Sequence, residues 1–176
     1  HAEERAAEGV PPLPLDRGQV QQLCALLEDP PAGEGAFLLA LLSERVPPGV
    51  DPAAEIKADW LGAIAAGEKT SPLVDPEQAI ALLGTMMGGY NVPHLTRALE
   101  GDHAAAAAIA LSRLVMVFDN FAVVEKLAGE GNAHAKQVLT SWAEAEWFTS
   151  MAPLPERIEG IVYKVAGETN TDDLSP

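Results

Sequence analysis

The chain has 176 residues, of which 48% are hydrophobic and only 5% aromatic, and its 26 acidic and 11 basic side chains give a formal charge of -15. Much of the apolar fraction is alanine rather than valine or isoleucine, which favours closely packed helices and excludes an all-β fold. The negative charge repels phosphate backbones and anionic lipid headgroups, so nucleic acid and membrane surfaces are not expected partners. No apolar run reaches the roughly 20 residues of a membrane span, so a soluble protein is expected.

The first two predicted helices form a hairpin. Asp16 and Gln19 have the spacing of a capping box, and the apolar stripe that follows them stops at Asp29. A second helix is expected from about Gly33 to Arg45, before a proline-rich turn.

The next two helices begin with the same sequence, an aspartate followed by a proline. Asp51 and Asp75 provide the side-chain oxygen of an N-cap, and proline at the next position lacks only a donor that would be unpaired there anyway. The first of these helices is expected to end at Gly67 and the second at Gly84, before the Gly88-Gly89 pair.

The second half of the chain predicts four more helices. They are expected from Pro93 to Leu99, from His103 to about Phe118, from Asn120 to Gly129 and from Asn132 to Phe148. Asp102 is the expected cap of the second of these, and Asn120 and Asn132 are the expected caps of the last two. The His103–Phe118 helix is apolar almost all round, so it should lie at the centre of the packing.

About eight antiparallel helices joined by short loops predict an all-α fold of stacked helical pairs, an α-solenoid such as the HEAT type. No fixed period runs through the sequence, so an irregular helical bundle is the alternative.

The sequence changes character after a proline-punctuated connector at residues 151–155. Ile161 to Val165 is the one β-branched run of the chain and predicts a single strand. One strand needs a partner, so the tail is expected to be the beginning of a truncated second domain.

The titratable side chains do not predict a metal site. The chain has four histidines, at His1, His94, His103 and His134. None has a second histidine or a carboxylate at the spacing of a metal-binding helix. Glu130 precedes His134 by four positions, but Gly131 and the Asn132 cap lie between them, so the two are not expected to share a helical face.

Cys24 is the only cysteine, which excludes an internal disulfide and any site that needs several thiolates from this chain, and which suits a reducing cytosol. It lies on the apolar stripe of its helix and is interpreted as a core residue rather than a nucleophile. The glycine-rich segment from Gly84 to Asn91 is interpreted as a helix stop, because no P-loop lysine follows it and no strand precedes it.

The remaining polar and aromatic candidates are assigned structural roles. Trp142, Trp147 and Phe148 are expected to pack in the core or between domains, with the anchoring of a partner as the alternative. The acidic positions interpreted as solvated faces are Glu28-Asp29, Glu144, Glu146 and Asp172-Asp173. No catalytic, cofactor-binding or metal-binding residue is therefore assigned.

Several strings of the sequence carry a family resemblance. They are Ala6 to Gly9, Pro30 to Glu34, Arg45 to Asp51, Leu82 to Met86 with Gly88 to Asn91, Phe118 to Phe121, Ala135 to Val138, Ala143 to Phe148 and Gly167 to Pro176. In these strings, and in their order, nearly the whole chain resembles the N-terminal part of the bacterial aconitate hydratase B family.

The resemblance implies a parent enzyme, a hydro-lyase of the citric acid cycle that interconverts citrate and isocitrate through cis-aconitate at a [4Fe-4S] cluster. The cluster cysteines of the family lie outside this chain, so the chain alone is expected to be inactive. The resemblance also implies a HEAT-like domain at residues 1–152, and a linker with the start of the swivelling domain at residues 153–176.

The expected partners follow from the same resemblance. They are the remaining domains of the parent enzyme, a second copy of the chain as a homodimer, and another protein, in the cytoplasm. The alternative function is a free-standing acidic helical-repeat scaffold that binds a basic protein.

Overall fold

The computed structural model describes residues 2–87, 89–150, 154–160 and 167, and these residues contain ten helices and no strand. The predicted all-α class is thus confirmed for the described residues, while the strand predicted at residues 161–165 lies outside them. None of the described helices is long and apolar enough to cross a membrane. The chain divides into two units, residues 1–13 with 152–176 and residues 14–151.

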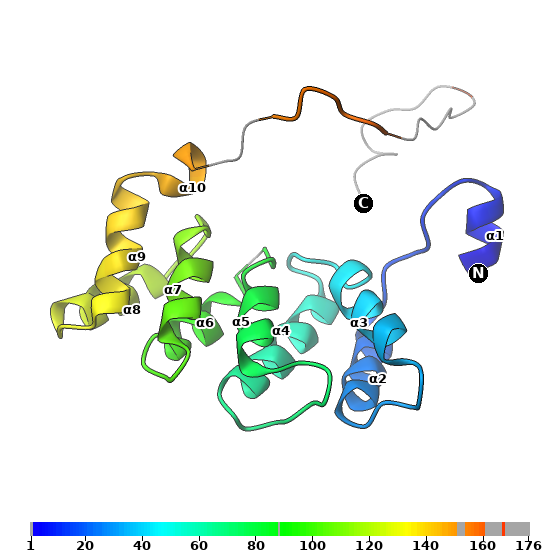
Figure 1. Ribbon diagram of the computed structural model, residues 1–176, viewed down its shortest axis with the longest axis horizontal. Helices are drawn as coiled ribbons and strands as arrows, with labels where there is room; N and C mark the ends of the chain where they lie inside the picture. Colours follow the sequence, from blue (N-terminus) through cyan, green and yellow to red (C-terminus); the bar gives the residue numbers. More distant parts are fainter. Residues whose placement is uncertain (1, 88, 151–153, 161–166, 168–176) are drawn as a thin grey trace. The chain divides into compact units, whose positions relative to one another are not determined.

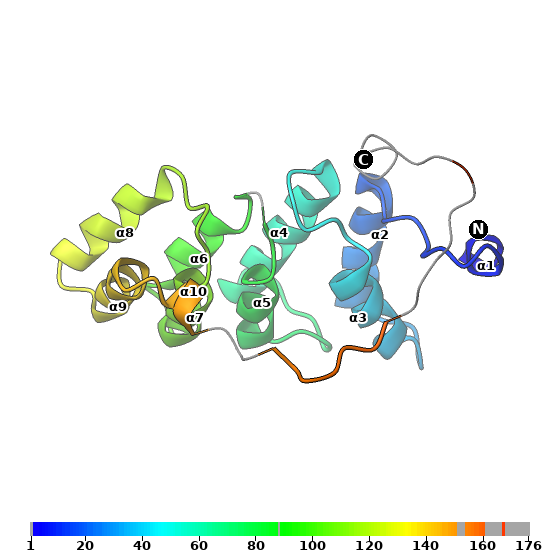
Figure 2. The same ribbon diagram turned by 90° about the horizontal axis from the view of Figure 1, so that it is seen from above.

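The unit of residues 14–151 is built from nine helices among its described residues. They are α2 (Arg17–Glu28), α3 (Gly35–Glu44), α4 (Pro52–Ala65), α5 (Pro76–Leu83), α6 (Val92–Ala98), α7 (Ala104–Ser112), α8 (Asn120–Gly129), α9 (Ala133–Ala143) and α10 (Glu146–Thr149). Figures 1 and 2 show that α2, α4, α6 and α8 form one row and that α3, α5, α7 and α9 form a second row beside it.

Packing between the helices follows these rows. Helix α2 contacts α3, α4 contacts α5, α6 contacts α7 and α8 contacts α9, so each consecutive pair spans the two rows. Neighbours within a row also pack, from α2 through α4 and α6 to α8, and from α5 through α7 to α9. Four consecutive helix pairs therefore stack side by side, with the apolar core between the rows.

The core depends on small residues where two helices approach closely. Ala107 and Ala108 of α7 are completely buried. A Cβ on Gly84, at the end of α5, would lie 3.0 Å from the Cβ of Ala110. Helix α7 accordingly contacts α5, α6 and α9, which agrees with its expected central position.

The unit of residues 1–13 and 152–176 contains one helix among its described residues, α1 (Ala2–Ala7), which the sequence analysis did not predict. Its six residues show no apolar stripe, and its acidic first turn at Glu3 and Glu4 is favourable at a helix N-terminus. The Nε of Arg5, on this helix, donates a hydrogen bond of 2.7 Å to the carbonyl oxygen of Pro11, which follows the helix.

The predicted caps at the beginning of α2, α4 and α5 are confirmed. Asp16 and Gln19 form a reciprocal capping box, with hydrogen bonds of 2.8 and 3.0 Å. Asp75 and Gln78 repeat it with the same two distances. Asp51 accepts a hydrogen bond of 2.7 Å from the backbone N–H of Ala53.

The cap at Asn132 joins two helices as well as ending one. Its Oδ1 accepts a hydrogen bond of 2.9 Å from the Ala135 N–H, and its Nδ2 donates one of 2.9 Å to the Leu99 carbonyl after α6. We expect Asn132→Ala to lose both bonds and about 2 kcal/mol of unfolding free energy, and Asn132→Asp to keep the cap and lose about 1 kcal/mol. Urea unfolding measures both; equal losses in the two variants would contradict a separate role of the Leu99 bond.

The predicted helix from His103 to Phe118 is wrong in its last six residues. Helix α7 ends at Ser112. The N–H groups of Arg113 and Leu114 donate to carbonyls three residues earlier, and residues 114–117 are not helical. Val115 and Val117 are β-branched and prefer extended backbone, which returns the side chain of Val117 to the core and leaves Val115 exposed. Ile109 on α7 is exposed as well, so the helix predicted to be apolar almost all round is not buried on every side.

Other predicted boundaries also need correction. Asp102 and Asn120 make no capping hydrogen bond, because the N-cap positions are His103 and Asp119, and neither of these makes a side-chain cap. The helix expected to run to Phe148 breaks at Ala145, whose φ of 54° places it in the left-handed region, so α9 and α10 are separate. Helix α3 begins at Gly35, two residues later than predicted.

Candidate functional site

The glycine-rich segment after α5 is fixed by one buried asparagine. The side chain of Asn91, only 1% exposed, donates hydrogen bonds of 2.7 Å to the Leu83 carbonyl and 3.1 Å to the Met86 carbonyl. These bonds pair carbonyls that the end of a helix would otherwise leave without partners. The segment is therefore a helix stop, as predicted, with Gly84 as its C-cap.

The backbone N–H groups of this segment are used inside the protein. Those of Thr85 and Met86 donate to carbonyls of α5, and that of Met87 donates to the Pro48 carbonyl at 2.5 Å. Gly89 has a φ of 99°, and a Cβ there would lie 3.2 Å from the ring of Phe118. A phosphate cradle needs free N–H groups, so the described part of the loop does not fit one.

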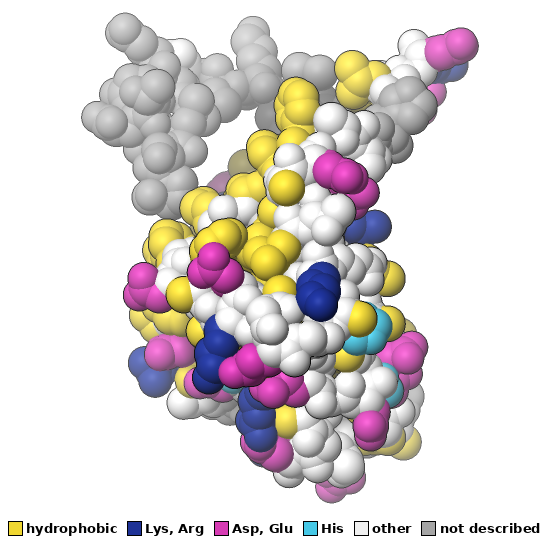
Figure 3. Space-filling view, turned by 90° about the vertical axis from the view of Figure 1, so that its left-hand side faces the viewer, with side chains coloured by type: hydrophobic (Ala, Val, Ile, Leu, Met, Phe, Trp, Pro, Cys, Tyr) yellow, Lys and Arg dark blue, Asp and Glu magenta, His cyan; other side chains and the backbone are white. Residues whose placement is uncertain are grey.

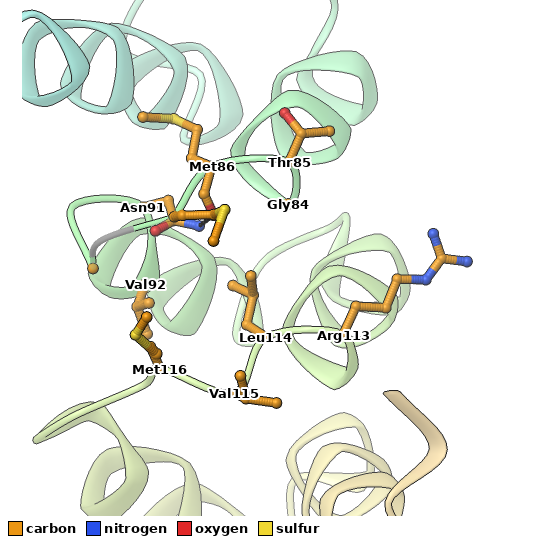
Figure 4. Close-up of a pocket in the computed structure, with 11 residues that line it drawn as sticks. Gly84, Thr85, Met86, Asn91, Val92, Arg113, Leu114, Val115 and Met116 are labelled. Atoms are coloured by element: carbon orange, nitrogen blue, oxygen red, sulfur yellow. Dashed lines mark hydrogen bonds between the residues drawn. The ribbon is translucent and has the colours of Figure 1, made fainter. Parts of the chain in front are cut away.

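A pocket of about 270 Å³ lies between this loop and the segment after α7 (Figure 4). Its walls are mostly apolar side chains, contributed by Met86, Met87, Val92, Leu114, Val115 and Met116. Figure 4 shows that the guanidinium of Arg113 points away from these apolar residues. The pocket can receive apolar side chains, and it offers no visible set of groups for chemistry.

Exposed hydrophobic side chains extend from the rim of this pocket. We call Met87, Val115, Met116 and Phe118 the 87–118 patch; each of the four is between 49% and 66% exposed. Figure 3 views the helical unit from its α8–α9 end and shows hydrophobic side chains gathered over the upper part of that view and charged side chains over its lower part. Contiguous apolar surface of this kind is typical of an interaction site.

The three aromatic residues near the end of the unit differ in their roles. Trp142 is half-buried, stacks on Phe121 with 6.0 Å between ring centroids, and donates a hydrogen bond of 3.0 Å to the Leu111 carbonyl. Trp147 and Phe148 contact each other edge to face and are exposed, so for them the expected core packing is wrong within the described residues.

A comparison with protein families shows which family this chain belongs to. The family model of the aconitate B N-terminal domain matches residues 1–148. The chain belongs to the aconitate B N-terminal domain family. The resemblance seen in the sequence strings is thereby confirmed.

Individual members of the aconitate B family are similar in sequence to this chain along all or nearly all of its length. A protein of Salmonella typhimurium named aconitate hydratase B is 58% identical over 100% of the chain. Proteins of the same name from Synechocystis and Helicobacter pylori are 51% and 44% identical over 100% and 98% of it. The chain spans about 20% of the length of these relatives.

The residues of this aconitate B domain do not fit an iron–sulfur cluster. A cluster needs several thiolates, and Cys24 is the only cysteine of the chain. Burial, with a smaller contribution from the charge of Glu28, raises the pKa of the Cys24 thiol to about 12, which disfavours the thiolate. Cys24 lies in the core, as predicted.

Two histidines have carboxylate partners that sequence spacing could not indicate. The Nε2 of His94 on α6 lies 3.1 Å from Asp59 on α4, and the Nδ1 of His103 lies 3.4 Å from Glu77 on α5. No group of three or more potential metal ligands occurs among the residues that the structure describes. Both pairs therefore link neighbouring helices.

The other acidic candidates within the described residues, Glu28, Asp29, Glu144 and Glu146, are exposed, and Asp172-Asp173 lie outside these residues. The carboxylate of Glu130 lies 3.7 Å from Lys126 on the same helix, and not on a common face with His134. Glu28 is exposed, in agreement with its interpretation as part of a solvated face, and it also accepts hydrogen bonds from Lys69 and from the indole of Trp60. The bond from Lys69, followed by that from Trp60, lowers the pKa of Glu28.

Proposed function

We propose that this chain is the N-terminal assembly module of an aconitate hydratase B. The parent enzyme would interconvert citrate and isocitrate through cis-aconitate in the citric acid cycle, in the cytoplasm. The [4Fe-4S] cluster and the substrate-binding residues would belong to other domains, so this chain alone would be inactive. The match to aconitate hydratase B along 100% of the chain carries the proposal.

In this proposal residues 1–152 form a HEAT-like domain, and residues 153–176 are a linker and the start of the swivelling domain. The four stacked helix pairs support the HEAT-like part. The relatives are about five times as long as the chain, so most of the parent lies outside it. The remaining domains of the parent are the expected neighbours, and the 87–118 patch is the surface that they would cover.

A matched pair of variants tests the patch in the full-length enzyme. Phe118 belongs to the patch and is 66% exposed, whereas Phe37 on α3 is 59% exposed and lies outside it. A buried aromatic anchor contributes more than about 1.4 kcal/mol to an interface, so Phe118→Ser should increase proteolytic cleavage between the module and the rest about tenfold. The rate at which the full-length enzyme hydrates cis-aconitate should decrease in the same variant.

The control variant Phe37→Ser should leave both the cleavage rate and the activity unchanged. Equal cleavage of the two variants would contradict the assignment of the patch to an interdomain contact. A homodimer or another protein would then be the candidate occupant of the patch, and sedimentation equilibrium of the full-length enzyme would distinguish them.

The second candidate function is a free-standing acidic scaffold that binds a basic protein, and the charge of -15 is the observation that favours it. The same charge opposes a nucleic-acid partner. A reading frame that continues from Pro176 into the cluster-binding region would overturn the scaffold, and a natural stop codon at that position would overturn the module.

A further inference from the structure

A second pocket, of about 190 Å³, lies where α10 folds back against α7 and α9. Its polar lining comes from three places in the sequence: Ser112 and Arg113 at the end of α7, Gln137 and Ser141 on α9, and Glu146 and Ser150 at the two ends of α10. This volume has room for about six water molecules, and pockets for drug-sized molecules begin at roughly 300 Å³. A ligand of this pocket therefore has to be small.

The fold of α10 provides the negative side of the pocket. Ala145 adopts the left-handed conformation with a φ of 54°, which reverses the chain between α9 and α10. The reversal brings Glu146 to Ser141, whose hydroxyl donates a hydrogen bond of 2.6 Å to the Glu146 Oε2. The hydroxyl of Ser150 donates to the Glu146 carbonyl. The carboxylate of Glu146 is thus held at the wall, and its second oxygen can accept a hydrogen bond from a ligand.

The end of α7 provides the positive side, with two donors that have no partner within the described part of the chain. The Oγ of Ser112 is buried and makes no hydrogen bond. Arg113 makes no ion pair there, whereas Arg97 pairs with Glu68 at 2.7 Å. A guanidinium matches the geometry of a carboxylate, and a buried hydroxyl without a partner costs free energy that a bound acceptor would recover.

Two exposed apolar side chains complete the lining. Ile109 on α7 is 53% exposed and Trp147 on α10 is 42% exposed, and both line this pocket. A ligand with an aliphatic group could cover part of both side chains, and removing apolar surface from water is favourable. The pocket therefore combines a cation, an anion and an apolar wall.

This combination selects a ligand that carries both charges. A simple carboxylate would leave Glu146 facing an anion, and a simple amine would leave Arg113 facing a cation. A zwitterion satisfies both side chains, and because its net charge is zero, the charge of -15 on the chain does not oppose its binding. An amino acid carries a carboxylate, an ammonium group and a side chain on a single carbon atom, so it offers all three groups within a small volume.

We propose that this pocket binds a small aliphatic amino acid. Its carboxylate lies at Arg113 and Ser112, its ammonium group at Glu146, and its side chain against Ile109 and Trp147. The inference does not rest on the proposed assembly role, because it uses only groups inside the helical unit. The bound amino acid would link the end of α7 to α10 and give this unit a response to the concentration of free amino acids.

Saturation-transfer NMR of the full-length protein with L-valine, isovalerate and isobutylamine, at constant ionic strength, tests the ligand class. Isovalerate lacks the ammonium group of valine, and isobutylamine lacks its carboxylate. Valine should bind with a Kd of about 1 mM, and each analogue should bind at least about tenfold more weakly because one charged side chain of the pocket loses its partner.

Three variants test the place of binding. Arg113→Gln and Glu146→Gln should each weaken valine binding about tenfold, and the amide of the second variant keeps an oxygen for the hydrogen bond from Ser141. Lys136→Gln is the control, because Lys136 is another exposed cation without an ion pair among the described residues and does not line the pocket. This variant should bind valine as the unchanged protein does.

Three results would overturn the inference. They are the lack of saturable valine binding, binding of either analogue as tight as that of valine, and equal loss of binding in Arg113→Gln and Lys136→Gln. Circular dichroism of each variant checks that it is folded. Because Arg113 and Glu146 are exposed, their substitution should not change the helix content.

Discussion

Replacing Gly62 with alanine should destabilise the protein by about 2 kcal/mol, although alanine is the better helix former. Gly62 lies on the buried face of α4, and a Cβ there would lie 2.1 Å from the Nδ1 and 2.4 Å from the Cγ of His94. The imidazole ring would have to move, which would break its 3.1 Å contact with Asp59 and separate α6 from α4. For a chain of this size, thermal unfolding should shift down by roughly 4 to 8 °C.

Gly129→Ala is the matched control for this substitution. Gly129 is also helical, at the end of α8, but nothing lies within 4 Å of its Cβ position, so alanine should be neutral or stabilise the protein by less than about 1 kcal/mol. The double variant Gly62→Ala/His94→Ala should remove the clash, and Gly62→Ala should then cost nothing in the His94→Ala background. An unchanged cost in that background would show that His94 is not the cause.

The sequence predicted those parts of the fold that depend on a few neighbouring residues. The capping boxes at Asp16 and Asp75 and the cap at Asn132 need only a side chain and an N–H two or three positions later, so their spacing indicates them directly. The end of α7 does not depend on spacing alone. The helix ends where Leu114 and Val117 can pack against the core from non-helical backbone. A helical pattern of apolar residues does not reveal this packing.

The candidate sites were missed for the same reason. Val115 and Met116 belong to the 87–118 patch, but the sequence analysis placed Val115 in a buried helix, because an apolar run looks the same in a core helix and on an exposed segment. The break between α9 and α10 depends on the left-handed conformation of Ala145, for which alanine gives no signal. The contacts of His94 and His103 join helices that are far apart in the sequence. The family strings nevertheless identified the relationship, since they need no knowledge of packing.

The stability of the protein should rise between about pH 8 and pH 10.5 because of Lys57. This side chain is 2% exposed, and its Nζ donates a hydrogen bond of 2.7 Å to the Leu42 carbonyl of α3. Burial lowers the pKa of Lys57 from 10.5 to about 8. Between these values the unfolded chain binds a proton that the folded chain does not, so the unfolding free energy increases with pH, by about 3 kcal/mol over the whole window.

Cys24 acts in the opposite direction at higher pH. Its thiol keeps its proton in the folded state up to about pH 12 and loses it near pH 9 in the unfolded chain, so its contribution to stability falls above pH 9. The contribution of Lys57 is therefore best measured in a Cys24→Ala background, by urea unfolding at a series of pH values from 7 to about 10. Lys57→Met in that background should abolish the rise, and Lys136→Met, at an exposed position, should keep it. Two results would contradict this explanation: an unfolding free energy that does not change with pH in the Cys24→Ala background, or an increase with pH that remains after Lys57→Met. Either would show that burial does not destabilise the charged form of Lys57.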